Sequence, residues 1–228
     1  MRPRQPVREK SRRTREHILF AAERLFAERG FSSSSMRDIT AAAGVNLSVV
    51  YYYFKDKEAL LFSVIESFVL PIMERERELL RAARGEAGAD EPIPPRRLVE
   101  SMILPRAECG SESARRLMMR LFSRSGPFEK KVFARLNELT KDVRDESAKE
   151  FCRTFSHLSE EEVRFRIANF VAMLNGWGAV APFLKDAGML RKEFPRDRRT
   201  YYEMLIALVL RLFAAPAMLP VPAEAERI

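Results

Sequence analysis

The chain has 228 residues, of which 46% are hydrophobic and 32% are charged. This balance excludes an intrinsically disordered chain and leaves room for one or two folded domains. Ala, Leu, Glu and Arg are abundant and runs of β-branched residues are scarce, so the composition predicts an all-α protein.

The net charge of +8 is concentrated near the N-terminus. Residues 1–57 hold 12 Lys and Arg against 6 Asp and Glu, whereas the other 171 residues hold 28 against 26. Seven of the basic residues fall within residues 1–15, where Glu9 is the one acid. We expect residues 1–13 to form a disordered basic arm, which suits nucleic acid or an anionic membrane and is equally compatible with a solvated tail.

The sequence favours a cytoplasmic protein. Its N-terminus is charged throughout and is therefore unlike a signal peptide. Cys109 and Cys152 lie far apart and in no metal-ligand spacing, which indicates reduced thiols. The longest uncharged run, residues 167–184, contains Asn, Gly and Pro and is shorter than the roughly 20 residues that span a bilayer. We interpret this run as a buried interface helix and expect no membrane partner.

A first helix is predicted over residues 14–29. Ile18, Ala22 and Phe26 recur at three- to four-residue spacing and form an apolar stripe. Gly30 follows directly and is typical of the residue that ends a helix.

Two short helices joined by a glycine turn are predicted next. Ser35 and Asp38 have the spacing of a capping box, in which each side chain bonds the other residue's backbone N–H. Gly44 ends the second helix, and Asn46 stands where it can cap the third. This arrangement is a helix-turn-helix, which places its second helix in the major groove of DNA. We therefore assign residues 14–57 to a DNA-binding domain.

Residues 58–228 are predicted to form a second, helical domain. Its first helix is capped by Asp56, contains Pro71 and ends at Gly85, after which residues 85–95 have the composition of a loop. Five more helices are expected at residues 95–106, 113–124, 127–155, 159–183 and 197–214.

Four consecutive aromatic residues, Tyr51–Phe54, end the third helix. They cannot all face the core, because successive helical residues point about 100° apart. The outward face mixes hydroxyls and an ammonium with apolar atoms, which suits a DNA groove with phosphates along its rims. The helical wheel places Val49, Val50, Tyr53 and Phe54 on the inner face and Leu47, Ser48, Tyr51, Tyr52 and Lys55 on the outer face.

Four segments between Thr14 and Leu61 occur together in a recognisable order, namely ILFAAERLFAERGF, SMRDITAAAGV, VYYYF and KDKEAL. At this spacing they resemble the DNA-binding domain of TetR-type bacterial transcriptional regulators. The resemblance implies a homodimer that binds a palindromic double-stranded DNA operator, represses transcription and is released by a small-molecule effector.

The resemblance also implies where DNA is contacted. Tyr51 and Tyr53 occupy positions where aromatic side chains touch phosphates, although the wheel turns Tyr53 inward, so Tyr51 ranks first. Thr40 stands where alanine is usual and would add a phosphate bond, Leu47 would read a thymine methyl group, and Lys57 would direct its charge at the DNA backbone. The candidate DNA contacts are Arg37, Thr40, Asn46, Leu47, Ser48, Tyr51, Tyr52, Tyr53, Lys55 and Lys57.

The same resemblance gives the C-terminal helices two roles. Residues 167–184 and 201–214 would form a four-helix dimer interface across a two-fold axis. Met and Phe side chains would line a pocket for an apolar effector, such as a long-chain fatty acid or its thioester, and each is also compatible with plain core packing. The candidate pocket residues are Met102, Met118, Phe122, Phe133, Phe155, Phe170, Met173 and Trp177.

Other functions have less support in the sequence. It contains no phosphate-binding loop, dinucleotide fingerprint, nucleophile elbow or paired-histidine metal site, so we expect no enzyme activity, metal or cofactor. Two alternatives stay open. The regulator could sense oxidation through Cys109 and Cys152, or the protein could bind membrane surfaces instead of DNA.

Overall fold

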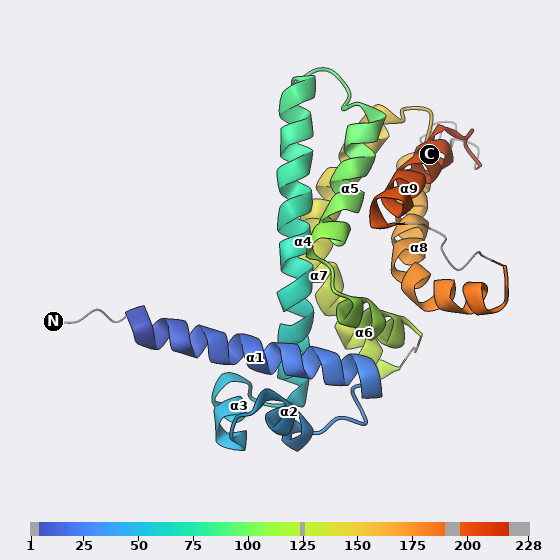
Figure 1. Cartoon of the computed structure of the whole chain (residues 1–228). Helices are drawn as coiled ribbons and strands as arrows, with labels where there is room; N and C mark the ends of the chain where they lie inside the picture. Colours follow the sequence, from blue (N-terminus) through green and yellow to red (C-terminus); the bar gives the residue numbers. More distant parts are fainter. Residues whose placement is uncertain (1–4, 124–125, 190–196, 219–228) are drawn as a thin grey trace, which may run out of the picture. The chain divides into compact units, whose positions relative to one another are not determined.

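The computed structural model describes residues 5–123, 126–189 and 197–218, apart from the side chains of residues 5–8, 175, 177–183 and 198. Within these residues the fold is all-α, as predicted (Figure 1). The helices of this part of the chain are α1 (Gln5–Arg29), α2 (Met36–Ala43), α3 (Leu47–Tyr53), α4 (Lys57–Ala87), α5 (Pro95–Cys109), α6 (Glu112–Phe122), α7 (Pro127–Thr154), α8 (Glu160–Asp186) and α9 (Arg198–Ala214).

The chain divides into two compact units. Unit 1 comprises Met1–Leu70 and Ser111–Leu139, and unit 2 comprises Pro71–Gly110 and Thr140–Ile228. This division differs from the predicted boundary at residue 57, because α6 and the first part of α7 group with the N-terminal helices.

Unit 1 is organised around α1, against which α2 and α6 pack. At the start of α6, Ser111 and Ser113 donate hydrogen bonds to the Glu23 carboxylate, the former at 2.6 Å. Near its end, Arg120 donates to the Glu28 carbonyl at 2.9 Å. These bonds at both ends of α6 explain why it belongs to unit 1. The buried stripe of α1 includes Ile18, Ala22, Leu25 and Phe26.

Helix α1 begins at Gln5, well before the predicted start at residue 14. Arg12 pairs with Glu9 and Glu16 at 3.1 and 3.2 Å, and Arg13 pairs with Glu9 at 3.1 Å. Pairs three and four residues apart stabilise an exposed helix even where it has no apolar stripe. The expected disordered arm is therefore wrong for residues 5–13, and residues 1–4 lie outside the described part.

Helix α4 is also longer than predicted. It continues through Gly85 to Ala87 and ends at Gly88, whose φ of 86° is the left-handed conformation that glycine adopts without strain. The predicted loop over residues 85–95 is therefore shorter in the structure, and Pro71 lies inside the helix.

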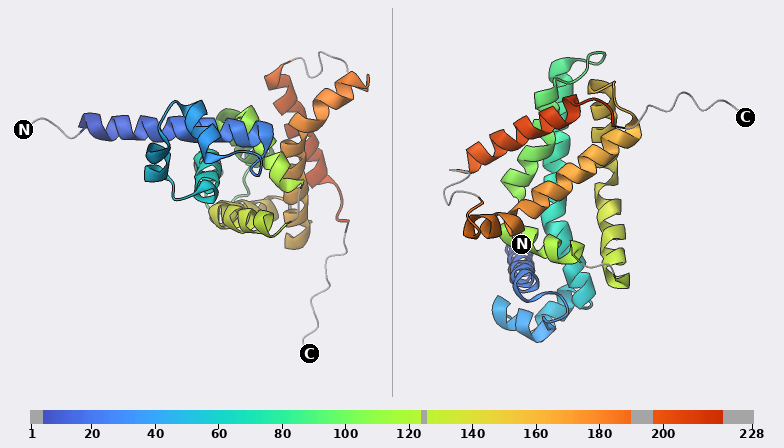
Figure 2. Two further views of the ribbon diagram at one scale, coloured as in Figure 1. Left: turned by 90° about the horizontal axis from the view of Figure 1, so that it is seen from below. Right: turned by 90° about the vertical axis from the view of Figure 1, so that its right-hand side faces the viewer.

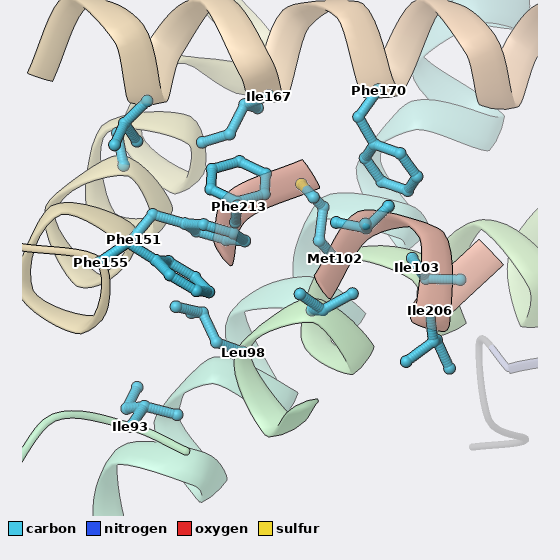
Figure 3. Packing of buried hydrophobic residues seen from close by; sticks show 14 of the residues in the cluster. Ile93, Leu98, Met102, Ile103, Phe151, Phe155, Ile167, Phe170, Ile206 and Phe213 are labelled. Atoms are coloured by element: carbon cyan, nitrogen blue, oxygen red, sulfur yellow. The ribbon is translucent and has the colours of Figure 1, made fainter. Parts of the chain in front are cut away.

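Unit 2 is built on a cluster of buried apolar side chains from α4, α5, α7, α8 and α9 (Figure 3). Within this cluster the ring centroid of Phe151 lies 5.9 Å from that of Phe155 and 4.7 Å from that of Phe213. Helix α9 packs along α5 and contacts α8 (Figures 1 and 2).

A buried ion pair also joins α8 to the end of α9. Arg166 and Glu162 are each 1% exposed and lie one turn apart on α8. Arg166 donates hydrogen bonds to the carbonyls of Leu212, Ala215 and Pro216. Arg166 thus donates to backbone carbonyls that the C-terminus of α9 would otherwise leave unbonded.

Candidate nucleic-acid interface

The start of α2 is fixed by the predicted capping box. The Asp38 backbone N–H donates to the Ser35 hydroxyl at 3.1 Å, and the Ser35 backbone N–H donates to the Asp38 carboxylate at 2.8 Å. The Ser35 hydroxyl also donates to this carboxylate at 2.5 Å. The Ser35 hydroxyl, and then its backbone N–H, lower the pKa of Asp38.

The turn between α2 and α3 depends on Gly44. Its φ of 64° lies in the left-handed region, and its N–H donates to the Ala41 carbonyl at 3.3 Å. Val45 N–H then donates to the Thr40 carbonyl at 3.1 Å. These two bonds close α2 and turn the chain into α3, which completes the predicted helix-turn-helix.

Helix α3 has one buried and one exposed side, as the helical wheel predicts. Val50 and Phe54 are 0% and 3% exposed, whereas Tyr51 and Tyr52 are 50% and 80% exposed. Burial of the former pair anchors the helix on α1 and α2, and the two exposed tyrosine rings present hydroxyls to solvent. Ser48, Asn46, Arg37 and Lys55 are also exposed, and Leu47 is half-buried.

An open concavity of about 620 Å³ lies beside this exposed side. Serine hydroxyls line one part of it, the apolar groups of Met36 and Leu47 another, and Arg37 adds a cation. The sequence reasoning missed the serines and Met36, because a Ser-rich loop is typical of any turn. The lining residues are Ser32, Ser33, Ser34, Ser35, Met36, Arg37, Leu47, Tyr51, Asp56 and Lys57.

Two candidate DNA contacts, Lys57 and Thr40, bond backbone carbonyls of unit 1 instead. Lys57 donates to the carbonyls of Phe31 and Ser34 at 2.9 Å each, and its ammonium lies 4.4 Å from the Phe31 ring centroid. Thr40 is 8% exposed, and its hydroxyl donates to the Arg37 carbonyl at 2.7 Å. We correct both assignments, because Lys57 closes the loop between α1 and α2 and Thr40 belongs to the interior.

Tyr53 faces inward, as the wheel predicts. Its half-buried hydroxyl lies 2.8 Å from the Ser11 hydroxyl and donates to the Ser11 carbonyl at 3.1 Å. This hydroxyl therefore bonds α1, and the structure gives no support to a phosphate contact. Ser11 has no sequence signal that points to Tyr53, because the two residues are 42 positions apart.

Asn46 is the N-cap residue of α3, but its side chain makes no capping hydrogen bond there. The amide is exposed and stays a candidate DNA contact. Together with Asn46, the candidates that the structure places on or beside the exposed side of α3 are Arg37, Leu47, Ser48, Tyr51, Tyr52 and Lys55.

The candidate pocket residues are divided between the two units. Met118, Phe122 and Phe133 belong to unit 1, where Phe122 and Phe133 stack with ring centroids 5.1 Å apart. Met102, Phe155 and Phe170 are packed in the core of unit 2, and Met173 of unit 2 is 38% exposed (Figure 3). The core packing of these three residues corrects their assignment as pocket walls. The side chain of Trp177 lies outside the described residues.

The surroundings of the two cysteines bear on one alternative function, the sensing of oxidation. Burial raises the pKa of both Cys109 and Cys152, which disfavours the reactive thiolate that a redox sensor needs. Among the described residues, no cluster of His, Cys, Asp and Glu has the geometry of a metal site. No described helix is long and apolar enough to cross a membrane.

Residues 18–64 match the family model described as bacterial regulatory proteins of the tetR family. The chain is 40% identical over 72 residues to the HTH-type transcriptional regulator AcrR of Shigella flexneri, covering 32% of this chain and 34% of that relative. It is 38% identical over 90 residues to the HTH-type transcriptional repressor BepR of Brucella suis, covering 40% of each chain. The chain thus spans less than half the length of these relatives.

Solved structures share the fold over most of the chain. A TetR-family transcriptional regulator from Bordetella parapertussis aligns with a TM-score of 0.57 at 22% identity, covering 89% of this chain and 94% of that one. SmeT, the repressor of the Stenotrophomonas maltophilia multidrug efflux pump SmeDEF, aligns with a TM-score of 0.54 at 21% identity, covering 87% of each chain. Residues 18–64, which contain the helix-turn-helix, thus match the tetR family of bacterial regulatory proteins, and the solved structures show that the fold is shared over most of the chain.

Proposed function

We propose that this protein is a transcriptional repressor that binds duplex DNA through α3. The observation that carries the proposal is the exposed side of α3, where Tyr51 and Tyr52 present hydroxyls next to exposed Ser48. Exposed Arg37 and Lys55 add positive charge on either side of this helix in the sequence. An α-helix of this kind fits the major groove, with hydroxyls and cations bonding phosphates at its rims.

The test is direct binding of the purified chain to DNA. Fragments retained from a genomic library supply the operator, and fluorescence anisotropy then gives the affinity as a function of salt. We expect the logarithm of the affinity to fall linearly with the logarithm of salt concentration, because phosphate binding releases counterions. Failure to retain any fragment at low salt contradicts the proposal.

Tyr51 is the residue that we expect to bond a phosphate. Tyr51→Phe removes the hydroxyl and keeps the ring, so it should weaken binding to the operator and to unrelated duplexes by a similar factor. A loss confined to the operator would instead make Tyr51 a base reader.

We also propose that the repressor is a homodimer formed through α8 and α9. Phe165 and Met173 of α8 are 56% and 38% exposed, and Met204 and Leu208 of α9 are 46% and 48% exposed. The spacings of eight and four residues place each pair on one face of its helix. Apolar faces of this kind mark a subunit interface, and a two-fold dimer carries two α3 helices for a palindromic operator.

Leu208→Glu tests the dimer. A buried carboxylate in the interface should convert the protein to a monomer in sedimentation velocity without loss of helix, and affinity for the operator should fall with it. Met189→Glu, at an exposed residue beyond α8, is the control and should stay dimeric. A monomeric wild-type protein would overturn this part of the proposal.

The effector that we propose is a small apolar molecule bound by unit 2, with long-chain fatty acids and their thioesters as the compounds to test. Apart from the likeness to ligand-responsive regulators, this proposal rests on the apolar character of unit 2 alone, because the Met and Phe side chains of its cluster are packed in the core. Such a ligand releases DNA only if it binds more tightly to the dimer conformation that cannot bind DNA than to the conformation that can. Titration of the dimer–operator complex with acyl compounds should lower anisotropy, and no release by any of them removes this effector class.

A further inference from the structure

The C-terminal end of α9 is held beside the start of α8 by two buried side chains of α8, Arg166 and Glu162 (Figure 2, right view). The Arg166 guanidinium donates to the carbonyls of Ala215 and of the proline after it at 3.2 and 2.8 Å. The Glu162 carboxylate accepts a hydrogen bond from the Met218 backbone N–H at 2.9 Å. Residues 215–218, which we call the tail segment, are therefore fastened to one turn of α8.

Pro216 explains why α9 ends here and why its last carbonyls bond a side chain. The residue before a proline is turned away from the helical conformation, and Ala215 is extended, with φ −64° and ψ 147°. Proline also lacks the backbone N–H that would otherwise bond the carbonyl of Leu212, four residues earlier. The Arg166 guanidinium donates to that carbonyl in its place. The sequence at the end of α9 thus creates the need for a donor that α8 supplies.

Helix α8 carries an uncharged, exposed stripe beside this point. Between residues 165 and 174 its exposed residues are Phe165, Ala168, Asn169, Ala172 and Met173. Spacings of three and four residues put all five on one side of the helix. Arg166 lies three residues before Asn169 and seven before Met173, so it borders the same side, yet it is 1% exposed. The end of α9 and the tail segment, whose carbonyls bond Arg166, therefore cover the edge of this stripe.

Helix α9 carries a similar stripe that ends close to the same point. Between residues 204 and 210 its exposed residues are Met204, Ala207 and Leu208, again at spacings of three and four and without charge. Leu208 lies one turn before Leu212, whose carbonyl bonds Arg166. The bonds of Arg166 therefore fix where the α9 stripe ends relative to the α8 stripe.

Stability alone is a poor explanation for this buried ion pair. Replacing such a pair by apolar side chains of similar size is often neutral or stabilising, because both charges must leave water. Hydrogen bonds differ from apolar contacts in being directional, so they specify one arrangement of two backbones. The bonds from Arg166 and Glu162 to the end of α9 and the tail segment have this property.

We propose that the Arg166–Glu162 pair and the tail segment position α9 against α8, so that the two stripes form one surface for a second copy of this chain. A second copy suits this surface because both stripes lack charge, and a two-fold axis places each stripe against the same surface of its partner. The inference rests on the proposed dimer and names the residues that set its geometry. Arg166 and Glu162 are positioning residues, since they act through α9.

The first experiment compares the dimer dissociation constants of two double variants by sedimentation equilibrium, Glu162→Leu/Arg166→Met and Glu160→Leu/Arg164→Met. The second is the matched control, because it removes an exposed pair of the same residue types and spacing on the same helix. We expect the dissociation constant to rise at least ~tenfold in the first variant. The control should stay within about threefold of the wild type, because exposed pairs contribute little. Circular dichroism checks that both variants keep their helix content.

Shortening the chain tests the tail segment. A chain that ends at Ala214 lacks the carbonyls and the N–H of the tail segment that bond α8, whereas a chain that ends at Met218 keeps them. We expect the shorter chain to dimerise at least ~tenfold more weakly. It should show no further loss in the Glu162→Leu/Arg166→Met background, because both changes remove the same contact. An equal loss in both backgrounds would mean that the tail segment contacts the partner itself, which overturns the positioning role.

Three other outcomes would also overturn the inference, and they are distinguishable. A purely stabilising pair would lower the free energy of unfolding, measured in the monomeric Leu208→Glu background, and leave the dissociation constant of the dimer unchanged. A dimeric wild type whose two double variants dissociate alike would overturn the positioning role alone. A monomeric wild type would overturn the proposed dimer, and the positioning role with it.

Discussion

The two units of this protein use aromatic side chains in opposite ways. In unit 1, Tyr51 and Tyr52 stand exposed on α3 and end in hydroxyls. In unit 2, Phe151, Phe155 and Phe213 are packed ring against ring in the core. The difference shows that a cluster of aromatic residues does not by itself indicate a site, because the hydroxyl and the exposure decide whether a ring binds a partner or fills a core.

The units also differ in how their helices are held. The short helices of unit 1 depend on capping residues such as Ser35 and Gly44, which begin and end a helix within a few residues. Unit 2 depends on the apolar cluster and on the buried Arg166–Glu162 pair. We therefore expect large stability effects from core substitutions in unit 2 and smaller, local effects from cap substitutions in unit 1.

The largest effect should come from Phe151→Ala. Phe151 is 0% exposed, and truncation leaves a cavity between Phe155 and Phe213. We expect the free energy of unfolding to fall by about 3–5 kcal/mol in urea denaturation. Tyr52→Phe, at a ring that is 80% exposed, should change it by less than about 0.5 kcal/mol. A similar loss in the free energy of unfolding for both substitutions would show that the two units do not differ in how they use aromatic side chains.

The next largest effect should come from Arg166→Met. It leaves the buried Glu162 carboxylate without its arginine and removes three donors from carbonyls at the end of α9. We expect a loss of about 3 kcal/mol in the free energy of unfolding. The double variant Glu162→Leu/Arg166→Met removes both charges and should be less destabilised than the single variant. A single variant as stable as the double one would mean that the pair is not effectively buried.

Much of the fold could be predicted because its signals are local. The Ser35–Asp38 spacing, Gly44 and the apolar stripe of α1 specify α1–α3 from neighbouring residues alone. The helical wheel likewise predicted the buried Val50 and the exposed Tyr51.

What could not be predicted depends on distant residues or on charge pairs. The Tyr53 hydroxyl meets Ser11, and Lys57 meets carbonyls of the loop before α2, which no local pattern reports. Residues 5–13 are helical through ion pairs such as Arg12–Glu9, although a run of arginines without an apolar stripe is typical of a disordered tail. The Met and Phe residues chosen as pocket walls had the right chemistry, but their spacing does not distinguish a cavity from a packed core.

Gly44→Ala should lower the free energy of unfolding less than Phe151→Ala or Arg166→Met does. The backbone at φ 64° disfavours any Cβ, and no atom within 4 Å would clash with one, so the cost is conformational. We expect about 1 kcal/mol of lost stability. Gly44→Asn should lose less, because asparagine tolerates the left-handed conformation. Equal losses for Ala and Asn in urea denaturation would point to a cause other than the backbone angle.

The smallest effect we predict is the pH dependence of the α2 cap. The bonds from Ser35 lower the pKa of Asp38 in the folded protein, so the carboxylate stabilises the fold above its unfolded pKa of about 3.9. This contribution is lost as the pH falls through the lower, folded pKa. Asp38→Asn keeps an acceptor without the charge. We therefore expect the difference in urea midpoint between wild type and Asp38→Asn to shrink between about pH 6 and about pH 3. A constant difference over this range would mean that hydrogen-bond geometry, and not the carboxylate charge, fixes the start of α2.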